Sequence, residues 1–406
     1  MKQGWTYKKL GDLYPIIMGK TPPRGIARFW DTKKETHNLW VSIADLSKNE
    51  GKEIKDTKEY ISNEAIGNIT KIAKGSLLVS FKLTLGKMAF AGDDLYTNEA
   101  IMSLGKRDDL SLKFLYYYFS SLDWGKIAGG SEKVKGKTLN KKSLSDIPIA
   151  YIPLSEQQRI VERLDSAFAH IDELKANAEK QVNEARALFQ KALSKAMEPK
   201  EGWEEKVFTD ICDVVTDFVA AGSFADLRKN VVYKELPDYA QLVRTTDLKH
   251  RFENKSFVYV NEHAFKYLYR VNLDEESIIL PNVGVNCGEV YYLHPEMLPY
   301  KNNVLGPNAI MVRSHKYNNQ FLSYLFLAKE MQVQLTHITS SMAQPKFNKT
   351  NLKTIRLHLP PLSEQQRIVE RLDSLSANVK ALEENQRKVM AECDALKQAL
   401  LRKVFE

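Results

Sequence analysis

The tripeptide Gly19-Lys20-Thr21 is the segment of this chain that most resembles a phosphate-binding loop. In such a loop, a glycine five residues before the Gly-Lys pair frees the backbone to wrap its N–H groups around a phosphate. That position holds Tyr14. The segment is therefore predicted to be a structural turn rather than a nucleotide site.

Other catalytic patterns are missing from the sequence as well. There is no Asn-Pro-Pro-aromatic signature for adenine methylation, no His-Glu-x-x-His pair and no Cys-x-x-Cys. His263 and His294 are predicted to be packed or surface histidines, and no base for a nucleophilic Cys287 can be identified. Scattered carboxylates fit a solvated surface better than a metal-dependent nuclease site. We therefore predict no catalytic, cofactor-binding or metal-binding residue.

The composition is that of a basic globular chain. Its 406 residues include 59 Lys and Arg against 51 Asp and Glu, and 43% are hydrophobic. This length suffices for two or three domains with buried cores, and a net charge of +8 is compatible with a polyanionic partner. No run approaches eighteen apolar residues, no signal peptide is recognisable, and the three cysteines are scattered. We expect a cytoplasmic protein in a reducing compartment, without a membrane segment.

Fourteen residues, from Pro-Leu-Ser-Glu-Gln-Gln-Arg-Ile to Asp-Ser, occur twice without a difference, at Pro153–Ser166 and Pro361–Ser374. The stretches that begin there contain neither Gly nor Pro after the first residue, which favours two long helices. Capping boxes are predicted at both helix starts: Ser155 with Gln158, and Ser363 with Gln366.

Heptad spacing follows in both stretches. In the second stretch the two series are Leu372, Val379, Gln386, Cys393 and Leu400, with Leu375, Leu382, Val389 and Leu396. In the first they are Leu164, Ile171, Ala178, Ala185 and Ala192, with Ala167, Leu174, Gln181 and Leu188. Spacing sustained over four heptads predicts a coiled coil, in which the smaller side chains of one helix face the larger ones of the other. The alternative is two unrelated amphipathic helices on separate cores.

A mixed segment precedes each helix, and the two segments share an apolar framework. Both open with Gly-Trp and contain matching runs, among them Val41–Leu46 against Val243–Leu248, and Ala-Ile-Met at Ala100 and Ala309. The residues between these positions mostly differ. We predict an α+β fold with a pseudo-two-fold internal repeat. Its parts are domains at 1–152 and 199–360, and helices at 153–198 and 361–406.

With this organisation, the chain resembles the specificity subunit of a type I restriction-modification system over essentially its whole length. The most specific carriers are the duplicated segments at Pro153–Ile160 and Pro361–Ile368. Gly19–Arg24 also resembles the Gly-x-Thr-Pro turn near the start of such domains, whereas the second domain departs from it at Asp217–Gly222. The resemblance implies two target recognition domains, separated by a long antiparallel two-helix coiled coil. Each domain would read one half of a bipartite, asymmetric site in double-stranded DNA.

The resemblance also implies partners that carry the chemistry. Modification subunits would bind S-adenosylmethionine and methylate adenine, and restriction subunits that use ATP and Mg²⁺ are a further partner class. This chain would then be a non-catalytic recognition subunit. Two rival classes stay open on the residues alone. One is a coiled-coil adaptor without DNA binding, and the other is a self-sufficient DNA-modifying enzyme.

Residues that face DNA are expected among the polar loop positions between framework strands, because amides, hydroxyls and cations read base edges and phosphates. In the first domain we select Lys82, Thr84, Lys87, Lys133, Lys135 and Lys137. In the second domain we select Arg244, Thr245, Asn282, Asn286, Gln344 and Lys346.

The repeated polar residues point to a shared partner, because a coiled-coil seam alone would constrain only apolar positions. The partner-binding candidates are Glu156, Gln157, Arg159, Glu162 and Arg163, with Glu364, Gln365, Arg367, Glu370 and Arg371. We expect two modification subunits per chain. Helices of about 43 residues would be roughly 65 Å long and would limit the DNA site to about 19 base pairs, with the half-site centres about 10 apart.

Overall fold

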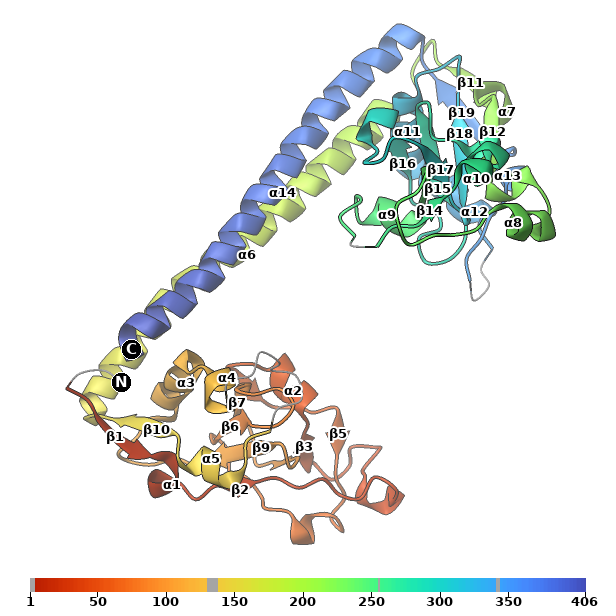
Figure 1. Cartoon of the computed structure of the whole chain (residues 1–406). Helices are drawn as coiled ribbons and strands as arrows, with labels where there is room; N and C mark the ends of the chain where they lie inside the picture. Colours follow the sequence, from red (N-terminus) through yellow and green to blue (C-terminus); the bar gives the residue numbers. More distant parts are fainter. Residues whose placement is uncertain (1–3, 130–137, 255, 341–343) are drawn as a thin grey trace. The chain divides into compact units, whose positions relative to one another are not determined.

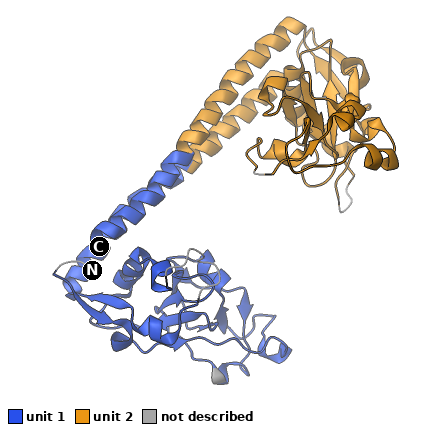
Figure 2. Cartoon of the chain, in the orientation of Figure 1, with its two compact units in different colours: residues 1–178, 387–406 blue, residues 179–386 orange. Residues whose placement is uncertain are grey.

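The computed structural model describes residues 4–129, 138–254, 256–340 and 344–406. The chain forms two compact units, which are coloured in Figure 2. Unit 1 comprises Met1–Ala178 and Arg387–Glu406, and unit 2 comprises Glu179–Gln386. Each unit consists of an α+β domain and parts of two long helices, α6 (Leu154–Met197) and α14 (Leu362–Phe405), as Figure 1 shows.

The domain of unit 1 is built on a five-stranded sheet with the order β2-β9-β6-β7-β4, beside a three-stranded sheet β5-β3-β8 and the pair β1-β10. Its strands are β1 Thr6–Lys9, β2 Ile17–Met18, β3 Leu39–Val41, β4 Glu53–Ile54, β5 Glu59–Tyr60, β6 Leu77–Ser80, β7 Met88–Ala91, β8 Tyr96–Thr97, β9 Ile101–Leu104 and β10 Pro148–Tyr151. Its helices are α1 Leu10–Leu13, η1 Ala27–Phe29, α2 Ile43–Lys48, η2 Ile66–Asn68, α3 Leu112–Ser121, α4 Trp124–Ile127 and α5 Lys141–Ser145.

The domain of unit 2 has the corresponding four-stranded sheet β12-β18-β15-β16, the three-stranded sheet β14-β13-β17 and the pair β11-β19. Its strands are β11 Glu204–Val207, β12 Val214–Asp217, β13 Ala240–Val243, β14 Tyr259–Val260, β15 Ser277–Pro281, β16 Tyr291–Leu293, β17 Asn303–Leu305, β18 Ala309–Arg313 and β19 Arg356–Leu359. Its helices are α7 Phe208–Ile211, η3 Phe218–Ala221, α8 Phe224–Asn230, α9 Thr245–Lys249, α10 Glu262–Tyr267, η4 Tyr269–Val271, η5 Pro295–Met297, α11 Asn319–Leu327, α12 Lys329–Ile338 and α13 Lys349–Leu352.

The central strands are buried on both faces, which explains their unbroken apolar runs. In β6, Leu77 and Val79 pack into the core that contains α3, whereas Leu78 packs into a second core against β3. In β15, Ile278 and Ile279 divide between two cores in the same way. Successive strand residues point to opposite faces, so each central strand joins two layers.

Each domain core also receives one end of each long helix. In unit 1, Ile160 near the start of α6 and Phe405 at the end of α14 join the core of α3. In unit 2, Ile368 near the start of α14 and Met197 at the end of α6 join the core of α11. The two units therefore repeat the same arrangement with the roles of the helices exchanged.

The helices run antiparallel within each unit. In unit 1, Asp172 pairs with Lys397, and Lys175 Nζ lies 2.8 Å from Asp394 Oδ1. In unit 2, Gln181 Oε1 accepts from Gln386 Nε2 at 2.8 Å, and Arg186 Nε lies 2.7 Å from Glu383 Oε1. Residue numbers rise along α6 as they fall along α14, as the predicted antiparallel coiled coil requires. None of the described helices is long and apolar enough to cross a membrane.

Two details of the helix predictions are wrong. The helices begin at Leu154 and Leu362, so Ser155 and Ser363 lie inside the first turn instead of at the N-cap. The second heptad series holds in α14 up to Val389, since Leu375, Leu382 and Val389 are half-buried and Leu396 is exposed. In α6 the series is displaced by one residue from Leu174 onward. Leu174, Gln181 and Leu188 are exposed, and the half-buried side chains lie one position later, at Lys175, Val182 and Phe189.

Candidate nucleic-acid and partner surfaces

Four of the six candidates in the second domain gather where two loops meet. The loop after β15 contains Asn282 and Asn286, and the segment before α13 contains Gln344 and Lys346. The loops are joined by hydrogen bonds: Gly284 N donates to Pro345 O at 2.9 Å, and the side-chain Nδ2 of Asn282 donates to Phe347 O at 2.9 Å. Side-chain amides and a cation therefore share one surface, as recognition of base edges and phosphates requires.

Lys249 belongs to the same surface, although it is not among the residues predicted from the sequence. Its Nζ donates to Asn286 Oδ1 at 2.6 Å and lies 3.5 Å from Glu289 Oε1. Lys249 is the last residue of α9 and directly follows the framework run Val243–Leu248. Because the run Val243–Leu248 matches Val41–Leu46 of the first domain, the position of Lys249 beside it is the sequence signal that could have identified this lysine.

Arg244, by contrast, has an internal role. It occupies the N-cap of α9, and its Nη2 donates to Asp247 Oδ1 at 2.7 Å and to Ser256 O at 2.6 Å. Asp247 is fully buried, and its hydrogen bond raises the pKa of Arg244. Much of the guanidinium fork is thus bound within the protein. Thr245 follows as the first residue of the helix.

The DNA-facing candidates of the first domain differ in the contacts that they make within the protein. Lys82, two residues after the end of β6, pairs with Thr138 through a backbone bridge, and Lys87 Nζ lies 3.2 Å from Glu50 Oε2. Thr84 O accepts a hydrogen bond from Ser80. Lys133, Lys135 and Lys137 lie outside the described residues.

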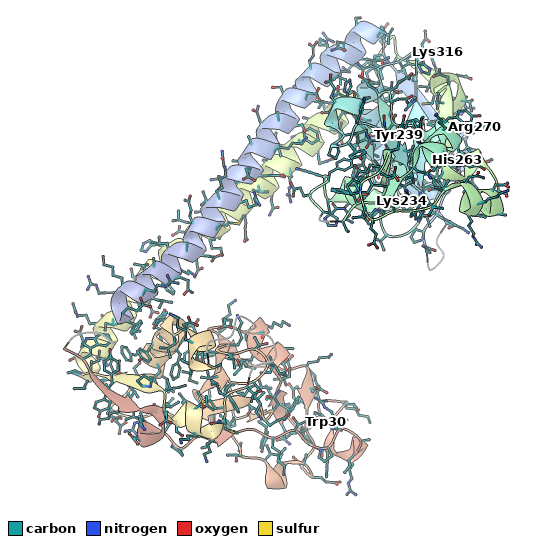
Figure 3. The ribbon with its side chains drawn as sticks, in the orientation of Figure 1. Trp30, Lys234, Tyr239, His263, Arg270 and Lys316 are labelled. Carbon is teal, nitrogen blue, oxygen red and sulfur yellow. The ribbon has the colours of Figure 1, made fainter. Side chains whose placement is uncertain are left out.

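The turn Gly19–Arg24 adds polar groups to this region. Thr21 donates a hydrogen bond to Glu99, and this bond lowers the pKa of that carboxyl group. Arg24 forms an ion pair with Glu59, and its Cζ lies 4.0 Å from the ring centre of Trp30, which is labelled in Figure 3. Thr21 and Arg24 are not among the residues predicted to face DNA, although the turn that contains them resembles the Gly-x-Thr-Pro turn of the family.

Two of the partner-binding candidates need correction, because Gln157 and Gln365 are fully buried. Gln157 Oε1 accepts from Ser111 N at 2.8 Å, and its Nε2 donates to Ile152 O at 2.8 Å. Gln365 makes the equivalent bonds to Asn318 N and Pro360 O, at 3.1 and 2.9 Å. These side chains fasten each long helix to its own domain, so a partner cannot reach them.

Other identical residues of the repeat have a similar internal task. Tyr117 donates to Asp165 Oδ1 at 2.5 Å in unit 1, and Tyr324 donates to Asp373 Oδ1 at 2.6 Å in unit 2. Burial, reinforced by these carboxylates, raises the pKa of both tyrosines. Part of the sequence identity is therefore explained by packing within the chain.

The rest of the repeat forms an exposed polar stripe on each helix. The polar positions exposed in both copies are Ser155, Gln158, Arg159, Glu162, Arg163 and Ser166, with Ser363, Gln366, Arg367, Glu370, Arg371 and Ser374. Their spacing of three and four residues places them on one face of each helix. Of the remaining candidates, Glu156 is half-buried and bonded to Arg159, while Glu364 receives Lys200 at 3.3 Å.

Two exposed leucines extend the match between the helices. Leu188 and Leu396 are 60% and 48% exposed and occupy equivalent positions, since Leu193 and Leu401, five residues further on, enter equivalent cores. Each is preceded by alanine, at Ala187 and Ala395. Heptad spacing predicts both leucines in the seam, so their exposure could not be predicted from it.

Other ionisable residues lie outside these two surfaces. Within residues 4–129, 138–254, 256–340 and 344–406, no three His, Cys, Asp or Glu side chains are grouped so that they could hold a metal ion. Burial raises the pKa of Cys287, which disfavours the thiolate that a nucleophile needs. His315 lies between Asp213 and Glu275, and its hydrogen bonds to them raise its pKa.

Comparison with known proteins agrees with this organisation. The family described as "Type I restriction modification DNA specificity domain" matches residues 2–184 and 200–391. The type I restriction enzyme MjaIX specificity subunit of Methanocaldococcus jannaschii is 24% identical over 401 residues, covering 91% of this chain and 85% of that protein. The EcoBI specificity subunit of Escherichia coli is 22% identical, covering 76% and 68%.

Solved structures share the fold. One, described as "Structural basis underlying complex assembly and conformational transition of the type I R-M system", superposes with a TM-score of 0.73 at 18% identity, over 100% of this chain and 98% of that one. The HsdS subunit from Thermoanaerobacter tengcongensis superposes with a TM-score of 0.51, also at 18% identity, over 100% and 97%.

The family model matches nearly the whole chain in two copies, one for each α+β domain and the helix that follows it. The chain therefore belongs to the type I restriction-modification DNA specificity family, as the non-catalytic subunit that gives such a system its DNA specificity.

Proposed function

We propose that residues 1–152 and 199–360 are two target recognition domains that read the unlike halves of a bipartite site in double-stranded DNA. The observation that carries this proposal is the surface at which Asn282, Asn286, Gln344 and Lys346 meet. The framework strands are common to both domains, whereas residues of the loops that follow the central strands, such as Lys82 and Asn282, differ. Different loops on a common framework predict an asymmetric site.

We further propose that two modification subunits bind each chain, one at each exposed polar stripe. A seam between two helices constrains only its inward positions. Arg159, Glu162 and Arg163 point outward and yet recur as Arg367, Glu370 and Arg371. The equivalent leucines Leu188 and Leu396 would give the partner an apolar contact on each helix.

The chemistry then belongs to the partners. The modification subunits would supply S-adenosylmethionine and methylate adenine, and restriction subunits would add ATP- and Mg²⁺-dependent cleavage. The chain would work in the cytoplasm, where it meets DNA.

DNA binding can be tested by gel shift with the purified chain, alone and with its modification subunit. Sequence-specific retardation is expected with the partner present. A protein-binding adaptor would give no DNA affinity in either condition, and a self-sufficient enzyme would methylate DNA alone.

Partner number can be tested by native mass spectrometry at saturating modification subunit. The wild-type chain should bind two copies, Arg163→Glu one copy, and the double variant Arg163→Glu with Arg371→Glu none. A suitable control is the charge reversal Glu179→Arg. Glu179 is exposed on α6, and the equivalent residue of α14 is Arg387, so the two helices do not have the same charge at this position. A one-to-one complex of the wild-type chain would contradict the two-copy model.

A further inference from the structure

A cavity of about 520 Å³ opens on unit 2 between η3, α8 and the loops after β15 and before β18. Its floor is formed by the buried side chains of Phe218, Leu227 and Val231. Phe224 and Tyr233 line its rim and are 72% and 52% exposed. Large apolar side chains gathered at a surface depression usually mark a binding site.

The cavity adjoins the proposed DNA surface. Asn282 and Val283 line it, and Val283 pairs with Lys346 through a backbone bridge. Arg228 also lines it, and Asp217 at its edge is paired with Lys349, whose Nζ lies 2.9 Å from Oδ1. The apolar centre is thus lined by the cation Arg228, its one anion is paired with Lys349, and Lys346 adjoins it, which suits a ligand with a polyanionic backbone.

The strand pairing of the two domains can be aligned, and this alignment identifies the segment of the first domain that corresponds to the cavity. Met18 lies opposite Met102 in unit 1, and Thr216 lies opposite Met311 in unit 2. Counting forward from these positions makes Val219 the equivalent of Thr21. The first domain thus presents a polar turn, with Thr21 bonded to Glu99, where the second domain presents an apolar rim.

This difference between the domains favours DNA over a protein partner as the occupant. A partner subunit that binds twice should meet surfaces that both units share, such as the polar stripe. A surface that is found on one domain but not on the other should bind something that also differs between the domains. The two DNA half-sites differ in this way. In the major groove, the apolar element of the base code is the methyl group of thymine, which phenylalanine can contact.

We propose that this cavity reads thymine methyl groups in the second half-site, with Phe224 as the main contact. The inference rests on the proposed function and adds a base preference to it. Phe224 is the first residue of α8, whose N-cap Ser223 accepts a hydrogen bond from Asp226 N at 3.2 Å.

Two residues labelled in Figure 3 hold the surrounding elements in place. His263 Nε2 lies 2.9 Å from Asn230 Oδ1 at the end of α8, and Arg270 Nη1 donates to Ala220 O of η3 at 3.3 Å. Because these contacts position the helix in advance, the ring of Phe224 can meet a methyl group without ordering a loop.

The test replaces each thymine of the second half-site by deoxyuridine, which removes only the methyl group. Affinity is measured for the chain in complex with its modification subunit, at fixed salt. A contacted methyl should contribute about three- to five-fold to the affinity, as expected for one buried carbon. The same replacements in the first half-site should change affinity less than two-fold.

Variants connect the effect to the cavity. Phe224→Ala should abolish the loss caused by deoxyuridine, and because Phe224 is largely exposed, the variant should fold. The matched control is Leu236→Ala, since Leu236 is 79% exposed in the same segment but is not among the residues that line the cavity. This control should retain the wild-type loss.

Three results would overturn the proposal: a second half-site without A·T pairs, no loss at any deoxyuridine, or an equal loss in Phe224→Ala. Loss of partner binding in Phe224→Ala, with the deoxyuridine effect intact, would assign the cavity to a protein. Absence of specific binding to the unmodified duplex would instead refute the proposed function itself.

Discussion

Gln157→Leu distinguishes two explanations for the repeated segment, internal fastening and partner binding. The wild-type side chain is fully buried and makes three hydrogen bonds, with Ser111 N at 2.8 Å, Ile152 O at 2.8 Å and Asp109 O at 3.1 Å. Leucine has similar volume but no polar atoms, so it would leave these backbone groups without that partner. A buried group that loses its partner costs about 1–3 kcal/mol. We expect unit 1 to lose about 3 kcal/mol of unfolding free energy.

The assay is urea denaturation of the full chain combined with hydrogen exchange, which assigns the loss to unit 1. The peptide that contains Ser111 should lose protection, because its amide no longer has an acceptor. Gln158→Leu is the control, since Gln158 is the exposed neighbour in the same helical turn. Surface changes usually alter stability by about 0.5 kcal/mol or less. Equal stability of the two variants, with weaker partner binding only in Gln157→Leu, would refute internal fastening.

Three further predictions concern pH, salt and spacing. His315 has its pKa raised from 6.5 by Asp213 and Glu275, so its contribution to stability is complete below pH 6.5 and is lost as the pH rises through the native pKa. NMR should show its ring titrating above 6.5, and His315→Gln should lack this pH dependence; titration at or below 6.5 would contradict it. Lys346→Gln should weaken DNA binding and lower the slope of log affinity against log salt by about one, and removing the charges of Lys133, Lys135 and Lys137 should flatten it further. An unchanged slope would show that these lysines do not face phosphate. Deleting one heptad from each long helix at equivalent positions should shorten the preferred spacer and leave both half-sites unchanged; altered half-site bases at constant spacing would refute the spacing role of the helices.

The fold could be predicted from sequence because its signals repeat. Two identical helix starts, long stretches without Gly or Pro, and matched strand runs indicate the same architecture twice. The heptad spacing alone does not show which residue faces the other helix, the third or the fourth after each position of the first heptad series. Leu174 and Leu188 are apolar and fit the wrong choice, while Lys175, which pairs with Asp394, takes an inward place that a charged residue does not suggest.

The surfaces were harder to predict than the fold, because a residue's type does not reveal its contacts. Gln157 and Arg159 look equally suited to a partner in the sequence, yet one is buried and the other is exposed. Arg244 looks like a base reader but caps a helix, whereas Lys249 joins the candidate surface through a side-chain contact 37 residues away. The cavity beside Phe224 depends on loops that only the fold brings together.

The most direct test of the central claim is to sequence the methylated bases in DNA from cells that express this chain with its modification subunit. The proposed function predicts one new motif with methylated adenine, made of two unlike half-sites separated by a fixed spacer, with centres about one helical turn apart. No new motif, or a single uninterrupted or symmetric motif, would contradict the claim that the two domains read separate half-sites.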